Sequence, residues 1–268
     1  MRAIWDIQHP HQFDPDQFVY HYTTRDTALE FILPERRLKL GLFGKMNDPR
    51  DAKALLLGLS NAVSDGFECR RIITYAGQKL KNVCKVLCVT RDDPQFCQGG
   101  NVLCRGFAHS RMWAQYANNH DGVCLVFDKQ KLNEAVTQGL GYKGRVFHDL
   151  VKYKNNYFDG PAPPPLDYQE ITSKGLESYL DEYVDQHHQA LFFHKNTDWE
   201  AEWEHRWVLR GNDEQEEYVY IENALIGIFL GVDFPRVYMP LVKRHGIPFL
   251  RIYWNNFGIP AFEHPHIS

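Results

Sequence analysis

The stretch Trp199–Arg206 constrains the fold of this chain more than any other segment. It reads WEAEWEHR, with Glu202, Glu204 and Arg206 at every second position. In a β-strand, side chains two residues apart lie on the same face. Two carboxylates and a guanidinium on one face are costly to bury, because each ion loses its water. We therefore expect this strand to line a water-containing cleft that handles a polar or cationic ligand.

The same three residues also fit an ion-pair ladder on an exposed strand, which contributes little to stability. The neighbouring Trp199, Trp203 and Trp207 favour partial shielding of the acids. Shielding by aromatic rings shifts the pKa of a carboxyl group and suits it to chemistry. The sequence leaves both interpretations open.

Composition sets wider limits on the fold and on the partners. The chain has 268 residues, of which 44% are hydrophobic and 14% aromatic, so it can bury a sizeable core. Its formal net charge of -4 argues against a general nucleic-acid coat, although a local basic cleft stays compatible with it. No apolar run reaches the roughly 20 residues of a transmembrane helix, and residues 1–6 lack the apolar core of a signal peptide. We expect a cytoplasmic protein with no membrane partner.

Six cysteines occur in the middle of the chain: Cys69, Cys84, Cys88, Cys97, Cys104 and Cys124. Without an export signal, we expect them to be free thiols. A zinc site on the second to fifth of these is the alternative. It is disfavoured because the paired C-x-x-C spacing of zinc knuckles is missing.

Hydrophobic periodicity alternates irregularly between the strand period and the helical period. Strands are expected at residues 18–23, 38–42, 85–90, 123–127, 142–153, 203–210, 217–222, 226–232 and 249–254. Helices are expected after a cap at Thr24 or Asp26, and at residues 51–82, 110–120, 129–138, 168–196 and 235–245, and a break of the helix over 51–82 near residues 64–66 stays open. This order predicts an α+β fold with mixed, largely antiparallel sheets and flanking helices.

The chain is expected to form a single domain over residues 1–268, because no repeat or low-complexity tract divides it. Three stretches are predicted to be irregular: a lead-in at residues 1–16, a Pro-rich loop at 155–167 and a tail at 256–268. Asn47–Asp48–Pro49 predicts a turn, because Asn and Asp bond their own backbone and Pro fixes φ.

The end of the first expected strand is a candidate ligand contact. There His21 offers a donor or acceptor, Tyr22 a flat ring for stacking, and Thr23 a hydroxyl. A core histidine flanked by sheet aromatics is the competing interpretation.

The helix expected from Ser110 to His120 carries a second group of candidates. Trp113, Tyr116 and His120 recur at steps of three and four, so they share one helix face, and Arg111 lies near the helix start. Such a stripe is also typical of a helix that faces the core, which explains Trp113 well. His120, in the last turn, is better placed for a contact with the helix dipole or a ligand.

The sequence lacks the short motifs of several enzyme classes. It has no G-x-G-x-x-G after a strand, no P-loop, no G-x-S-x-G and no H-E-x-x-H. Dinucleotide-binding Rossmann folds, P-loop NTPases, serine hydrolases of the nucleophile-elbow type and zinc metalloproteases are therefore disfavoured.

Several short motifs nevertheless occur in a specific order. They are Tyr20–Thr23, Asn47–Pro49, Met112–Trp113, Tyr116–Ala117, His120, Gly122–Cys124, and Lys195 followed by Trp199, Glu202, Glu204 and Arg206. Together they resemble a bacterial family catalogued as a domain of unknown function, over about residues 18–232. The chain departs from that family's pattern at Cys88-Val89-Thr90, where Cys-Phe-Ser is usual.

The order of a strand-borne His, an aromatic helix and a late Glu also remotely resembles the ADP-ribosyltransferase superfamily. This resemblance implies an ADP-ribosyltransferase-like fold, NAD as a substrate and no metal. It assigns His21 to a ribose hydroxyl, Tyr22 or Tyr116 to the nicotinamide, and Glu202 or Glu204 to catalysis.

Two arginines extend the set that the resemblance implies. Arg206 is expected to bind a pyrophosphate oxygen or to orient the acid, and Arg111 to reach a phosphate. Thr23, Trp113 and His120 complete the NAD-binding candidates.

The predicted function is an NAD-dependent ADP-ribosyltransferase that acts on a macromolecular acceptor, either nucleic acid or protein. The resemblance implies a toxin or a phage-defence effector, with an antitoxin or regulator as a further partner. Two alternatives stay open, a non-catalytic protein that binds a nucleotide or a partner and a nucleic-acid-processing defence enzyme.

Overall fold

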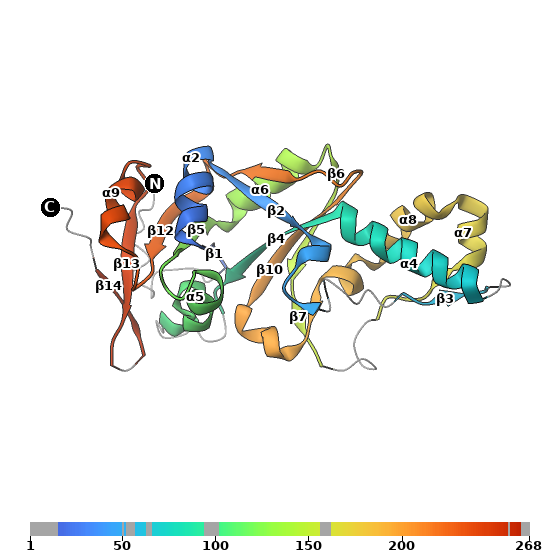
Figure 1. Cartoon of the computed structure of the whole chain (residues 1–268), viewed down its shortest axis with the longest axis horizontal. Coiled ribbons are helices and arrows are strands. Elements are labelled where there is room, and N and C mark those ends of the chain that lie inside the picture. The colour runs from blue at the N-terminus through green and yellow to red at the C-terminus, as the bar shows by residue number, and fades with distance from the viewer. Residues whose placement is uncertain are drawn as a thin grey trace.

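A computed structural model describes residues 16–49, 51, 57–62, 66–93, 102–155, 162–256 and 258–263. Residues 1–15 of the predicted lead-in, residues 156–161 of the Pro-rich loop, Cys97 and the last five residues lie outside these ranges. The fold is α+β, as predicted, and is built on one mixed sheet (Figure 1).

The main sheet follows the order β11-β2-β4-β1-β5-β12-β13-β14, and β10 joins β4 to β6. Among the described strands, only β12 and β13 pair in parallel within this sheet. The bounds are β1 Phe18–Thr23, β2 Arg37–Leu42, β4 Cys84–Arg91, β5 Val123–Asp128, β6 Gly144–Leu150, β10 Glu204–Gly211, β11 Glu217–Tyr220, β12 Leu225–Leu230, β13 Phe249–Trp254 and β14 Pro260–Glu263.

Strand β4 pairs with β1, β2 and β10, and one of its two edges is only partly paired. Along the other edge, β10 pairs with β4 without a break from Thr90 to Cys84. On the incomplete edge, β1 pairs at Thr90 and Arg91, whereas β2 pairs at Lys85 and Val86. Between these two ladders, residues 87–89 pair with neither β1 nor β2. The sheet therefore has a gap at the middle of β4.

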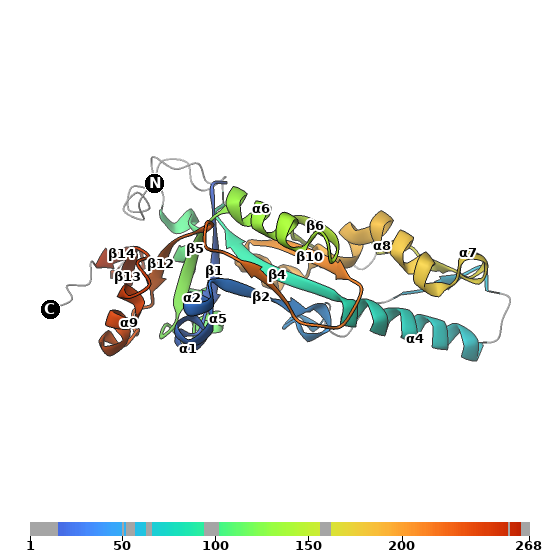
Figure 2. The ribbon, with the colours of Figure 1, turned by 90° about the horizontal axis from the view of Figure 1, so that it is seen from above.

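The two faces of β10 belong to different cores, because side chains alternate along a strand. Trp207 and Leu209 join the core beneath helix α6 (Lys129–Leu140). Val208, on the opposite face, joins the core beneath α4 (Gly66–Val83) and α8 (Leu176–Phe192). Figure 2 shows α6 on one side of the sheet. It also shows α4, α7 (Tyr168–Lys174) and α8 extending away from the sheet at one end.

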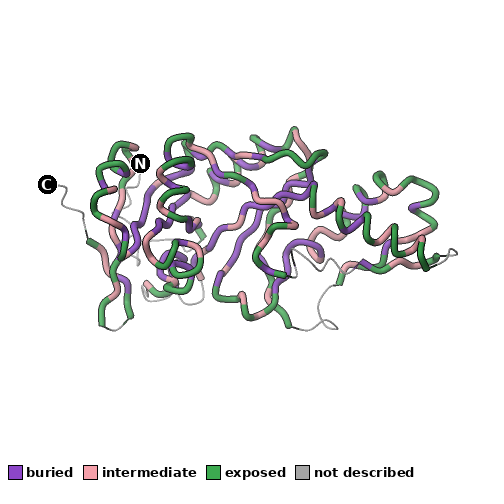
Figure 3. The backbone as a smooth tube through the Cα atoms, viewed as in Figure 1, coloured by how far each residue is buried: buried purple, intermediate pink, exposed green. Residues whose placement is uncertain are grey.

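A third core lies under β1, β5, β12 and β13. There Tyr20 and Tyr22 of β1 pack with Phe107 and with Trp113 of helix α5 (Ser110–Tyr116). Most residues of the central strands β1, β4, β5 and β10 are buried, whereas many residues of the helices are exposed (Figure 3).

Most expected strands are found, but several helices differ from the prediction. In the segment 51–82, residues 59–60 form the short strand β3, which pairs with β8 (Leu166–Asp167), and helix α4 begins at Gly66, whereas residues 52–56 and 63–65 lie outside the described ranges. The long helix expected over 168–196 is divided into α7 and α8 by Gly175, whose φ of 80° favours glycine. The helix expected over 235–245 consists of η8 (Arg236–Tyr238) and α9 (Met239–Lys243).

The first helical segment begins as predicted with Thr24, whose side chain accepts a hydrogen bond from the Thr27 amide. It continues as α1 (Arg25–Thr27), a π-helical turn at Ala28–Ile32 and α2 (Leu33–Glu35). Asn47 and Asp48 form a bend, in agreement with the predicted turn.

Helix α5 is shorter than predicted and its cap is different. His109, not Ser110, is the N-cap residue, and the helix ends at Tyr116. Asn118, Asn119 and His120 then adopt positive φ values of 47°, 52° and 71°. His120 therefore lies in a left-handed turn and does not share a helix face with Trp113.

Two further expectations are wrong. The tail predicted at 256–268 contains β14, which pairs with β13 from Arg251↔Glu263 to Trp254↔Pro260. Cys104 is disulfide-bonded, contrary to the expected free thiol, whereas Cys69, Cys84, Cys88 and Cys124 form no disulfide. Within the described ranges, no helix is both long and apolar enough to cross a membrane.

Gly122 marks a point where the backbone leaves no room for a side chain. A Cβ atom there would lie 2.3 Å from the Thr23 carbonyl oxygen and 2.9 Å from the Ala117 Cα. We expect Gly122→Ala to lower the free energy of unfolding by about 1–3 kcal/mol, because neither backbone neighbour can move aside alone. Urea denaturation measures the change.

Gly139→Ala is the matched control, since a Cβ at this exposed position of α6 meets nothing within 4 Å. It should leave stability unchanged or raise it by about 0.4–1 kcal/mol. Equal stability of the two variants would contradict the close approach at Gly122.

Candidate functional site

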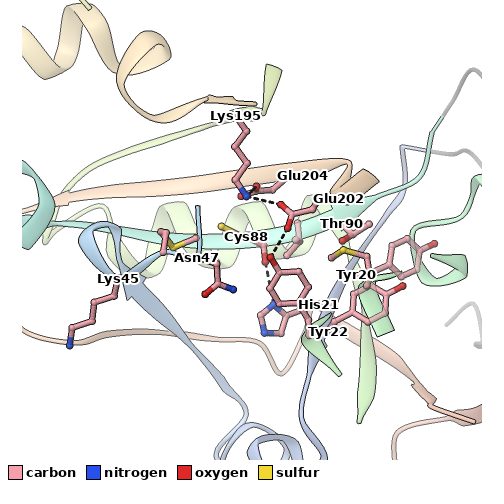
Figure 4. A pocket seen from close by; sticks show the side chains of 14 residues that line it. Tyr20, His21, Tyr22, Lys45, Asn47, Cys88, Thr90, Lys195, Glu202 and Glu204 are labelled. Carbon is pink, nitrogen blue, oxygen red and sulfur yellow. Dashed lines mark hydrogen bonds and ion pairs between the residues drawn. The ribbon is translucent and has the colours of Figure 1, made fainter. Parts of the chain in front are cut away.

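A cavity of about 190 Å³ lies at the gap in the edge of β4. Its wall includes Cys88 and Val89 of β4, which pair with neither β1 nor β2, and Thr90, which pairs with Tyr20 of β1. The other lining residues come from β1, from the segment after β2, from α5 and from the acidic stretch: Tyr20, His21, Tyr22, Lys45, Met46, Asn47, Met112, Tyr116, Lys195, Glu202 and Glu204. Figure 4 shows these side chains converging from segments far apart in the sequence.

His21 bridges the gap between β1 and β4. Its Nδ1 lies 3.2 Å from the Cys88 carbonyl oxygen. Since a carbonyl only accepts, Nδ1 carries the proton when the ring is neutral, and Nε2 presents a lone pair. Burial lowers the pKa of His21, which favours this neutral form. The ring therefore offers a fixed acceptor to a ligand hydroxyl.

Lys195 holds the two acids of the cavity together. Its Nζ lies 2.6 Å from Glu202 Oε2 and 2.7 Å from Glu204 Oε2, and its ammonium also sits 5.1 Å from the centre of the Trp199 ring. The other oxygen of Glu202, Oε1, accepts a hydrogen bond from the Tyr116 hydroxyl (Figure 4). Lys195 and both acids are buried, so these are desolvated, charge-assisted contacts.

Arg206 holds Glu204 in place from the side that faces away from the cavity. The guanidinium bonds Glu204 through Nε and Nη2, Asp51 through Nη2 at 2.6 Å, and the Phe192 carbonyl through Nη1 at 2.7 Å. Arg206 is fully buried and does not line the cavity. The expectation that it binds a pyrophosphate oxygen is therefore wrong, and its position fits the alternative role of orienting the acid.

The environment gives the two acids different proton affinities. Burial raises the pKa of Glu202, and the negative charge of Glu204 adds to this, against the opposing charge of Lys195. For Glu204 burial acts in the same direction, but the charges of Arg206 and Lys195 outweigh it and hold the pKa at about 2. A pair of carboxyls separated in this way can divide acid–base and electrostatic roles between them.

The acidic stretch is not the continuous strand that its alternation predicts. Glu202 ends a 3₁₀ turn, η7 (Thr197–Glu202), and Trp203 has a positive φ of 45°, so β10 begins only at Glu204. Glu202 and Glu204 converge because the chain turns at Trp203, not because they share a strand face. Glu204 and Arg206 do share a face of β10.

The acids are also more deeply buried than the expected wet cleft or exposed ladder implies. Glu202, Glu204 and Arg206 are 5%, 3% and 0% exposed. Of the three tryptophans expected around them, Trp199 covers Lys195, whereas Trp203 packs against His109 with ring centroids 4.0 Å apart. Trp207 faces the core on the other side of β10.

Several predicted site residues lie outside the cavity wall. Trp113 is fully buried, donates from Nε1 to the Phe107 carbonyl, and supports Tyr22 through an edge contact at 5.2 Å. Thr23 ends β1, and Arg111 is exposed with Nη1 on the Asp198 carbonyl. His120 stacks near Trp113, with centroids 6.5 Å apart, in the turn after α5.

Other lining residues were not assigned any role from the sequence. The sequence analysis includes Lys195 in a motif but predicts no contact for it. Its position depends on the pairing of β9 (His194–Lys195) with β7 (Lys152–Tyr153), which local sequence does not reveal. Asn47 belongs to the predicted turn, and Lys45 follows β2, with its ammonium directed away from the acids in Figure 4. Among the residues with described positions, no group of three or more His, Cys, Asp or Glu is arranged to hold a metal ion.

The comparison with family models finds one match. A model described as protein of unknown function, DUF2971, matches residues 112–207. Over this stretch, less than half of the chain, the protein is similar to that family. The stretch carries Tyr116, Lys195, Glu202, Glu204 and Arg206 but not β1. No curated protein and no solved structure matches the chain.

Replacement of Arg206 should be costly, because it leaves Glu204 and Asp51 buried without their shared counter-charge. We expect Arg206→Met to lower the free energy of unfolding by about 3–5 kcal/mol at neutral pH. Arg111→Met is the matched control, with an expected change within about 0.5 kcal/mol at its exposed position. Urea denaturation of both variants tests this, and a wild-type midpoint for Arg206→Met would contradict the structural role.

Proposed function

We propose that this protein is an NAD-dependent ADP-ribosyltransferase that acts on a macromolecular acceptor. The observation that carries the proposal is that His21, Tyr116 and Glu202, from three distant parts of the chain, line one cavity. These are the residue types that the remote resemblance assigns to the ribose, the nicotinamide and the catalytic acid. An ADP-ribosyltransferase-like arrangement of the sheet belongs to the same proposal.

The size of the cavity fits part of NAD. At about 190 Å³ it is smaller than the roughly 300–1,000 Å³ of pockets that enclose whole drug-sized ligands. It suits a nicotinamide with part of its ribose, whereas the phosphates and the adenosine would lie at the rim near Lys45. Tyr22 and Tyr116 supply aromatic surface for the ring, and Tyr22 is fixed by a hydrogen bond to the Gly106 carbonyl at 2.6 Å.

The chemistry of the two acids favours Glu202 as the catalytic group. Cleavage of the bond between nicotinamide and ribose builds positive charge on the sugar, as in glycoside hydrolysis. A carboxylate on the adjacent ribose hydroxyl stabilises this charge as it develops. Glu204 is held by Arg206 and Lys195, while Glu202 has a raised pKa, which suits it to accept a proton from the attacking acceptor.

His21 and Lys195 complete the proposed arrangement. The Nε2 lone pair of His21 accepts a ribose hydroxyl, which orients the sugar against Glu202. Lys195 keeps both carboxyls in one geometry through its two short ion pairs. The toxin or phage-defence setting, and an antitoxin or regulator as partner, are what the same resemblance suggests.

A second candidate function is non-catalytic binding of a nucleotide. It is favoured by the way Lys195 already neutralises Glu202 and Glu204, because a structural ion-pair network needs no reaction. Calorimetry with NAD and ADP-ribose separates the two functions. Binding of either compound without release of nicotinamide would favour this second function.

Glu202→Gln tests the proposed catalytic acid. We expect the variant to lose NAD cleavage at least about 100-fold in kcat, because the amide cannot carry the negative charge that faces the ribose. The measurement is release of nicotinamide from NAD, resolved by liquid chromatography. Glu200→Gln, two residues away and exposed, is the control and should retain the wild-type rate. Full activity of Glu202→Gln would refute the assignment.

Tyr116→Phe tests the hydrogen bond that stabilises the ionised form of Glu202. Without the hydroxyl, the pKa of Glu202 rises further, because one donor to the charged form is lost. A catalytic carboxylate is active above its pKa, so the acid limb of kcat/KM should move to higher pH. Tyr142→Phe, at an exposed position, should leave the profile unchanged. An unshifted acid limb in Tyr116→Phe would count against Glu202 as the titrating group.

A further inference from the structure

A second cavity lies on the other face of β10. Glu204 and Arg206 face the acidic site, whereas His205 and Trp207 face this cavity, whose volume is about 580 Å³. It opens between β10, β6 and the start of α6, which lie together in Figure 2. Nothing in the acidic site uses these side chains.

The floor of this cavity contains a histidine whose two ring nitrogens are not hydrogen-bonded to any described residue. His205 is 4% exposed, and neither Nδ1 nor Nε2 has a hydrogen-bond partner among the residues that the structure describes. A buried imidazole with both nitrogens unsatisfied is costly, so a ligand atom that bonds either nitrogen is favoured. Burial, reinforced by the charges of Lys129 and His148, lowers the pKa of His205 to about 3. The ring is therefore neutral and offers one donor and one acceptor.

The other walls add a donor and a flat surface. Trp207 donates from Nε1 to Asn133 Oδ1 at 2.9 Å, which fixes the Asn133 amide and leaves its NH₂ group as a donor beside the cavity. His148 is exposed at the rim, with its ring centroid 5.8 Å from that of His205 and 6.4 Å from that of Trp207. Aromatic rings therefore border a cavity whose floor carries a neutral donor–acceptor pair.

The charges around the cavity disfavour an anion. Lys129 is paired with Asp16 at 2.5 Å, so its positive charge is already balanced. Asp128, which caps α6 by accepting from the Lys131 amide at 3.0 Å, adds a negative charge to the wall. A phosphate would be repelled by the carboxylates of Asp16 and Asp128, while the ammonium of Lys129 is already paired. An uncharged planar ring is not subject to this electrostatic repulsion.

We propose that this cavity binds an uncharged heteroaromatic ring of the nucleobase class, one of whose donor or acceptor atoms bonds a ring nitrogen of His205. The Asn133 amide supplies a further donor, and the ring stacks against His148. The inference does not depend on the proposed transferase activity, because no residue of the acidic site takes part in it.

The test uses the full chain and four nucleosides: adenosine, guanosine, cytidine and uridine. We expect at least one to bind with a Kd on the order of 1 mM or lower and to shift the ring ¹⁵N resonances of His205, whereas free ribose does neither. The His205 signals are assigned by their loss in His205→Phe. Absence of any shift with all four nucleosides would overturn the proposal.

Asn133→Asp is the discriminating variant, because it keeps an oxygen that accepts from Trp207 and replaces the NH₂ donor with a negatively charged acceptor oxygen. We expect it to weaken nucleoside binding about tenfold or more, while His187→Gln on α8, away from this cavity, binds as the wild type does. Undiminished binding by Asn133→Asp would contradict the assignment. So would a nucleoside monophosphate that binds about tenfold more tightly than its nucleoside, since that result marks an anion site.

Discussion

The contact on which the candidate site depends is the buried charge network around Lys195 and Arg206. These two cations hold Glu202, Glu204 and Asp51, which belong to η7, β10 and the segment after β2. Ions buried this deeply are tolerated only when their partners are close and well oriented. The network therefore fixes the acids in one position, and the fold around it must bring all five side chains together before any ligand arrives.

Alternation along strands explains why much of the sheet is predictable from sequence. The β-branched and aromatic runs at 18–23, 85–90 and 123–127 correspond closely to β1, β4 and β5. Local sequence patterns do not predict the structure where the φ and ψ angles of a single residue change the direction of the chain. Trp203 looks like one more strand residue, but its left-handed conformation separates Glu202 from β10. Helix α5 ends earlier than predicted. The Asn118–Asn119 pair is the sequence feature that indicates this end, because Asn tolerates positive φ better than most residues.

The candidate site is less predictable than the sheet, because its geometry is set by contacts between distant segments. The sequence suggested His21, Tyr116 and the two acids as a group, and these side chains do line one cavity. The sequence does not indicate whether Arg206 faces a ligand or lies buried on the far side of the acids, as it does in the structure. Lys195 had no assigned role for the same reason, since only the pairing of β7 with β9 places it over both carboxyls.

The incomplete edge of β4 has a mechanical consequence. Strands β1, β5, β12 and β13 are joined to β4 through only two residue pairs, Val19↔Arg91 and Tyr20↔Thr90. A twist of one half of the sheet against the other therefore strains few backbone hydrogen bonds between β1 and β4, whereas the core cluster that includes Val19 and Leu87 packs across both halves. The cavity between His21 and the acids lies at this gap, so a small rotation of one half of the sheet against the other would change how tightly the cavity encloses a ligand.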